Sequence, residues 1–167
     1  RAHLALDSAL HESRRCNDEF GLQSVYASRV RLLVQEGRAK EACAIEPPDL
    51  EASLRSMKGE VLASRGLALA SMGRLEEARA LRAVALETTA GVEARVLGAA
   101  IDAVCAVNSL ATGKMETVEW LVWTAFDAGA VDLVVTAYRG NPDLLVALLS
   151  SPIAREQAMY IVTRAGD

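Results

Sequence analysis

The sequence has 167 residues, of which 51% are hydrophobic and 24% are charged. This composition suits one compact domain with a core, or a short array of helical repeats, and it excludes a disordered tail. The formal net charge is -4, so the chain lacks the basic surface that a nucleic-acid phosphate backbone requires.

Proline and glycine punctuation divides the chain into predicted helices. Alanine and leucine are its most frequent residues, and no stretch shows the sustained period-two alternation of a strand. We therefore expect an all-α fold with about nine helices and no sheet. Asn17 or Asp18 should cap the second helix, Asp49 the fourth, and Ser151 the last. After the end of a helix at 1–15, the expected helices are 18–36, 38–46, 49–72, 74–88, 92 to about 111, 114–128, 131–138, 143–149 and 152–164.

The cysteines and the start of the chain bear on its location. Cys16, Cys43 and Cys105 are odd in number and form no C-x-x-C pair, which predicts reduced thiols and a cytoplasmic protein. The sequence begins at Arg1 without a signal-peptide pattern, so we interpret it as a piece of a longer polypeptide. Aspartates interrupt the most apolar stretches, and we expect no membrane span.

A short motif recurs along the chain. Gly37–Ala42 and Gly73–Ala78 share the pattern Gly-Arg-x-x-Glu-Ala, and Gly113–Val118 is a weaker third copy. The spacing of about 36 to 40 residues is typical of helical-hairpin repeats. Glycine ends one helix, and the small residue lets the next helix pack closely on its antiparallel partner. The predicted hairpin units of this single domain, residues 1–167, are 18–48, 49–90 and 91–129, with further helices at 130–167.

The middle unit resembles a tetratricopeptide repeat. It keeps about half of the apolar, small and turn positions that define that family, and the other two units keep fewer of them. The matching residues of the middle unit are Leu62, Gly66, Leu69, Gly73, Ala78 and Ala85. The resemblance implies antiparallel hairpins stacked as a degenerate array. The irregular spacing does not imply a regular superhelix.

A second resemblance concerns function. The degenerate helical repeats, the stretch Leu67–Ala78 and the closing stretch Val134–Leu145 are similar to the helical regions of large bacterial LuxR-type transcription regulators, including MalT-like members. In that family such a region precedes a C-terminal helix-turn-helix, which this chain lacks. The resemblance implies a module that senses a small-molecule effector or a regulatory protein and acts on DNA only through that absent domain. A free-standing tetratricopeptide-like scaffold for protein binding is the alternative.

Six residues are candidates for ligand or partner binding. The tetratricopeptide resemblance places Arg31, Glu60 and Leu67 on the inner face of the array. Asp102 lies in an apolar helix, where a carboxylate needs a partner, and we favour a structural partner such as Arg95 or a helix terminus over a ligand. Trp120 and Trp123, with Phe126, share a helix face, for which we favour packing in the core or between helices over an apolar effector pocket.

The sequence gives no support for catalysis. It contains no G-x-S-x-G, P-loop or G-x-G-x-x-G motif, and no cysteine or serine has a catalytic context. His3 and His11 lack the spacing of a metal-binding pair on a helix. We therefore expect no enzyme, no metal and no cofactor. The apolar inner face is compatible with a homodimer as well as with a ligand.

Overall fold

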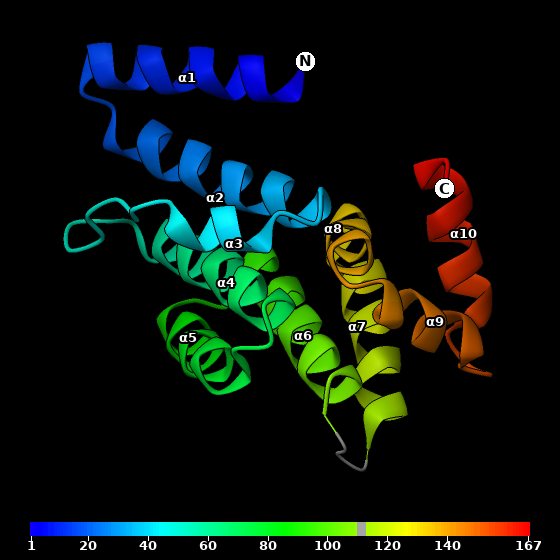
Figure 1. Ribbon diagram of the computed structural model, residues 1–167. Helices are drawn as coiled ribbons and strands as arrows, with labels where there is room; N and C mark the ends of the chain where they lie inside the picture. The colour runs from blue at the N-terminus through cyan, green and yellow to red at the C-terminus, as the bar shows by residue number, and fades with distance from the viewer. Residues whose placement is uncertain (110–112) are drawn as a thin grey trace.

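The computed structural model describes residues 1–109 and 113–167, and this part of the chain contains ten α-helices and no strand (Figure 1). The predicted all-α fold is confirmed, with ten helices where about nine were expected. The helices are α1 (Ala2–Cys16), α2 (Glu19–Gln35), α3 (Ala39–Ala44), α4 (Arg55–Ser71), α5 (Leu75–Thr88), α6 (Val92–Val107), α7 (Lys114–Ala128), α8 (Asp132–Gly140), α9 (Pro142–Ser150) and α10 (Arg155–Ala165).

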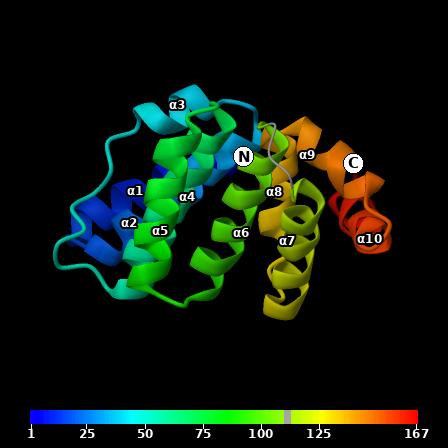
Figure 2. The ribbon, with the colours of Figure 1, turned by 90° about the horizontal axis from the view of Figure 1, so that it is seen from below.

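The helices α2, α4 and α6 pack against one another in that order. Each is followed along the chain by a helix that contacts it, namely α3, α5 and α7. Figure 2 shows α5, α6 and α7 beside one another on one side of the molecule. These three consecutive pairs fall within the predicted hairpin units. That they form an array of tetratricopeptide type stays a prediction.

The Gly-Arg-x-x-Glu-Ala motif forms the same turn in its first two copies. Gly37 and Gly73 have φ angles of 73° and 76°, in the left-handed region that a side chain disfavours. The motif's arginine precedes the next helix and forms an ion pair with the motif's glutamate, at 2.8 Å in the first copy and 2.5 Å in the second. The closing alanine is fully buried in both copies. In both copies the motif glycine therefore ends one helix, the arginine and glutamate form an ion pair at the start of the next helix, and the alanine allows close helix packing.

The third copy departs from this turn. Gly113 also has a left-handed φ, of 84°, but it is the N-cap of α7 and does not directly follow α6, which ends at Val107. The end predicted near Ala111 lies outside the described residues. Lys114 and Thr117 replace the arginine and glutamate, and the Thr117 hydroxyl donates a hydrogen bond to the carbonyl of Lys114 at 2.9 Å. The third turn therefore uses a local hydroxyl bond where the others use an ion pair.

Two of the predicted helix starts are wrong. Asp18 caps α2 as expected, but α4 begins at Arg55 and not after Asp49. Gln23 of α2 donates hydrogen bonds to the Asp49 carbonyl at 3.2 Å and to Ser53 Oγ at 2.7 Å, which hold this segment as a loop. Ser151 caps a turn, through bonds from two backbone amides, before α10 begins at Arg155. Tertiary hydrogen bonds therefore move the start of α4 to a later residue, and the preceding turn does the same for α10.

Among the C-terminal helices, α8 packs against α2 near the start of the chain. α8 contacts both α2 and α6 (Figure 1), and a Cβ on Gly140 would lie 2.7 Å from the backbone oxygen of Val34, so only glycine fits there. Asn141 donates a hydrogen bond to Ser71 Oγ at 2.9 Å, at the end of α4. One apolar core extends from α2 to α10. Within the described residues, no helix combines the length and apolar character needed to cross a membrane.

Candidate functional site

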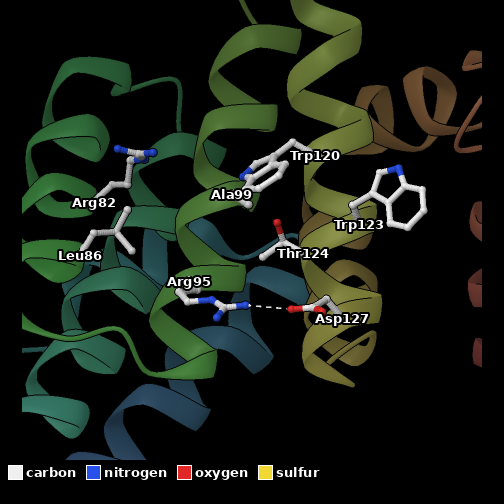
Figure 3. A pocket seen from close by; sticks show the side chains of 8 residues that line it. All are labelled: Arg82, Leu86, Arg95, Ala99, Trp120, Trp123, Thr124 and Asp127. Atoms are coloured by element: carbon white, nitrogen blue, oxygen red, sulfur yellow. Dashed lines mark hydrogen bonds and ion pairs between the residues drawn. The ribbon is translucent and has the colours of Figure 1, made fainter.

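A groove of about 690 Å³ lies on the side of the molecule formed by α5, α6 and α7 (Figure 3). Its volume falls in the range of about 300 to 1,000 Å³ that is usual for small-molecule sites. We call it the α5–α7 groove. It is lined by Arg82 and Leu86 from α5, Arg95 and Ala99 from α6, and Trp120, Trp123, Thr124 and Asp127 from α7.

The sequence of α7 explains why it presents aromatic residues to this groove. Its four groove residues follow the spacing of one helix face. The other face carries the core residues Val118, Leu121, Val122 and Ala125, all of them buried. The helix thus carries large apolar side chains on two faces, and the core accepts only the face of Val118, Leu121, Val122 and Ala125. The tryptophans belong to the other.

The tryptophans do not pack between helices as we expected. The exposed fraction is 64% for Trp120 and 60% for Trp123. Figure 3 shows the Trp120 ring extending toward Ala99 of α6, while the Trp123 ring points away from α6. Trp123 also borders a smaller apolar hollow with Ile153. The favoured interpretation, packing in the core or between helices, is therefore wrong for the two tryptophans, whereas Phe126 packs on Tyr160 of α10 with ring centroids 5.9 Å apart.

Two ion pairs lie at the groove. Arg82 contacts Asp102 at 2.6 Å, whereas Arg95 contacts Asp127 across the groove at the longer distance of 3.4 Å. Asp102 therefore has a structural partner, as we favoured, but this partner is Arg82 and not Arg95, which lies two turns earlier on the same helix and contacts α7 instead. Burial raises the pKa of the Asp102 carboxyl above its usual value, and the nearby Arg82 guanidinium opposes this rise.

Two polar atoms of groove residues have no hydrogen-bond partner. They are the buried Nε of Arg82 and the buried hydroxyl of Thr124, whose residue is only 8% exposed. A buried polar atom without a partner costs about 1 to 3 kcal/mol. Both can donate a hydrogen bond, one from α5 and one from α7. Two residues that line the groove therefore carry buried donors that no other described atom satisfies.

The predicted inner-face residues form a different arrangement. Arg31 and Glu60 form an ion pair at 2.5 Å, with side chains only 18% and 15% exposed. Ser28 and Ser64 lie at 3.4 Å from the same guanidinium. Leu67 is fully buried in the core and presents no surface to a ligand. The structure therefore separates Arg31, Glu60 and Leu67 from the tryptophans and Asp102, and it leaves the first two largely satisfied by each other.

Groups suited to catalysis are not gathered in the groove. Within residues 1–109 and 113–167, no cluster of three histidine, cysteine or carboxylate side chains could hold a metal ion. Burial raises the pKa values of the Cys43 and Cys105 thiols, which disfavours the reactive thiolate form. The groove itself offers arginines, a hydroxyl and indole rings, and this set is suited to binding.

Sequence reasoning missed most of the groove. Arg82, Leu86, Ala99, Thr124 and Asp127 were not candidates. The spacing of Thr124 and Asp127 behind the two tryptophans is a signal that could have found them, because all four share one face of α7. The contribution of α5 depends on how this helix packs on α6, and no local pattern reports it.

No protein-family profile, curated protein sequence or solved structure matches the chain.

Proposed function

We propose that this chain is a non-catalytic sensing module that binds a small-molecule effector in the α5–α7 groove. The observation that carries the proposal is the pair of solvent-exposed tryptophans beside unpartnered hydrogen-bond donors. A monomeric soluble surface seldom exposes large apolar side chains together unless they serve an interaction. The resemblance to the helical regions of LuxR-type regulators adds that the module acts on a separate DNA-binding domain. The odd number and scattered positions of the cysteines support a cytoplasmic location.

The packing around Trp123 supports a route for coupling. Trp123 borders the groove on one side and, with Ile153 and Gln157, the small hollow next to α10 on the other. The far end of α10 is fixed to α8, because Arg139 binds the Asp167 carboxylate at 2.7 Å. A ligand that displaces the Trp123 ring therefore acts beside the start of α10, whose far end is held against α8.

Thermal unfolding with a chemically diverse compound collection tests the sensing function. A ligand present at 100 times its dissociation constant stabilises the folded state by about 2.7 kcal/mol, which raises the unfolding temperature by several degrees. The same compounds should not stabilise Trp120→Ala. If no compound raises the unfolding temperature of the unaltered chain, the module does not bind small molecules.

The regulator assignment has a separate test. This test reads the coding DNA upstream and downstream of the 167 codons. The regulator assignment predicts a helix-turn-helix within about 100 codons after Asp167. A stop codon soon after Asp167, with no DNA-binding segment upstream, would exclude the regulator.

A protein-binding scaffold is the second candidate. It is favoured by the aromatic contact between Phe126 of α7 and Tyr160 of α10, whose ring centroids lie 5.9 Å apart while both side chains remain partly exposed. This contact extends the exposed apolar surface from Trp123 onto α10. Affinity capture with the unaltered chain and with Tyr160→Asp distinguishes a specific partner of this surface from background.

A further inference from the structure

We propose that the ligand of the α5–α7 groove is a planar aromatic compound bearing an anionic oxygen group, in the simplest case an aromatic carboxylate. This inference rests on the proposed sensing function and specifies the chemistry of its ligand.

The aromatic part of the ligand follows from Trp120. Its ring is 64% exposed and extends over Ala99 in Figure 3, so the small side chain of α6 leaves one indole face open to the groove. Leu86 lies on the opposite wall, on α5. A flat ring stacked on an indole face gains more than an aliphatic group of equal area, because aromatic pairs have favourable offset geometries. A planar ring system is the ligand body that uses this wall best.

The anionic part follows from the donors. The charged residues lining the groove are two arginines and one aspartate, in a chain whose net charge is -4. Asp102 neutralises one face of Arg82, but the Nε of that guanidinium has no partner. Among the described residues, the one ion pair of Arg95 is the 3.4 Å contact with Asp127, and both side chains are exposed. Arg95 can therefore leave Asp127 and bind a carboxylate in the two-bond geometry that a guanidinium favours.

Thr124 supplies a further donor to the same anion. Its side chain extends from α7 toward α6, between the tryptophan and aspartate positions (Figure 3), and its hydroxyl is buried without a partner. Asp127 is the single carboxylate acceptor among the lining residues. A ligand with hydrogen-bond acceptors can bind the donors of Arg82, Arg95 and Thr124, whereas a cation is repelled by the two arginines. The charge pattern thus opposes cationic ligands and favours an oxyanion.

The test uses three compounds of matched size: 2-naphthoate, its neutral amide 2-naphthamide, and decalin-2-carboxylate, which has the charge and no aromatic ring. Binding is measured by titration calorimetry. The indole N–H signals in a proton–nitrogen NMR spectrum report the place, because Trp120 and Trp123 are the only two tryptophans of the chain. We expect 2-naphthoate to bind at least about tenfold more tightly than either companion and to shift the indole signals.

Matched variants locate the charge effect. Arg95→Gln should remove most of the preference for 2-naphthoate over 2-naphthamide. Arg79→Gln serves as the control, because Arg79 is on α5, pairs with Glu76 and does not line the groove. Thr124→Val, which keeps the shape of the side chain, should weaken 2-naphthoate binding several-fold. Far-ultraviolet circular dichroism and the unfolding temperature establish that each variant is folded.

The possible results separate this inference from the function on which it rests. If 2-naphthoate and either companion bind equally, or if Arg95→Gln and Arg79→Gln have equal effects, the proposal that the ligand is an aromatic anion is overturned. If all three compounds fail while other compounds stabilise the chain and shift the indole signals, the ligand class is wrong and the sensing function stands. If no compound of any class binds, both proposals fall.

Discussion

The chain contains two charged clusters that differ in what they leave unused. Between α2 and α4, Arg31 and Glu60 bind each other at 2.5 Å and are largely shielded from water. In the α5–α7 groove, Arg82 also binds a carboxylate closely, but one of its nitrogens and a nearby threonine hydroxyl have no partner. The first cluster is closed and the second is open. A charged residue on a predicted inner face is therefore weaker evidence for a ligand site than a donor that the protein itself does not satisfy.

The largest expected effect contrasts Leu67 with Trp120. Leu67→Ala should lower the free energy of unfolding by about 3 kcal/mol, because it leaves a cavity at a fully buried site. Trp120→Ala removes a larger side chain but should cost less than about 1 kcal/mol, because most of that ring is in water. Urea unfolding of both variants measures the difference. A larger loss at Trp120 than at Leu67 would contradict the assignment of Leu67 to the core and of Trp120 to the solvent-exposed groove.

The second contrast concerns the closed ion pair. Glu60→Ala should cost about 2 kcal/mol, because it leaves the shielded Arg31 guanidinium without its counter-charge. The double variant Arg31→Met with Glu60→Leu should recover most of this loss, since it removes both charges and keeps apolar volume. Urea unfolding of the unaltered chain and of the single and double variants measures the loss and its recovery. A double variant that is less stable than Glu60→Ala would show that the pair does more than neutralise itself.

The third prediction concerns pH and Asp102. Burial raises the pKa of this carboxyl in the folded chain above its ordinary value near 3.8. As pH rises through the window between these two pKa values, the unfolded chain loses the proton first, so this group's contribution to stability falls. Compared with Asp102→Asn, which cannot titrate there, the unaltered chain should be relatively most stable in acid and should lose this advantage as the pH rises toward neutral.

Urea unfolding of both proteins between pH 4 and pH 7 gives this difference directly. If the advantage of the unaltered chain grows as pH rises, the folded-state pKa of Asp102 is lowered, and the Arg82 guanidinium outweighs burial.

The smallest effect is expected at the open ion pair. Asp127→Ala should change the free energy of unfolding by less than about 0.5 kcal/mol, because its contact with Arg95 is long and both side chains are exposed. This change should nevertheless strengthen 2-naphthoate binding, since it releases Arg95. Unfolding and calorimetry on the same variant measure the two effects. A stability loss equal to that of Glu60→Ala would remove the distinction between the two clusters.

Local chemistry accounts for the parts of the fold that the sequence predicts well. The glycine turns at Gly37 and Gly73 and the Asp18 cap depend on neighbouring residues alone, and each forms as expected. The start of α4 was misplaced because a glutamine on another helix holds Asp49 in a loop. Local pattern therefore fails where a distant side chain competes for the same backbone.

The candidate site was predictable only in part, for a related reason. Trp120 and Trp123 were identified from their helical spacing, but the apolar character that marks a core residue does not say which of two apolar faces the core accepts. Asp102 was identified as a carboxylate in need of a partner, while its partner Arg82 depends on the packing of α5 against α6. A donor such as the Thr124 hydroxyl is recognised as a candidate only in the structure, where its lack of a hydrogen-bond partner can be seen.

The hydrogen bond from Asn141 to Ser71 has a consequence for how the chain acquires its structure. It joins residues that are 70 positions apart, whereas α4 and α5, or α6 and α7, meet through short connections. Closing a long loop costs more entropy than closing a short one, and contacts between distant residues slow folding. We therefore expect the helix pairs to form early, and the docking of α8, with α9 and α10 behind it, to be the slow and late event.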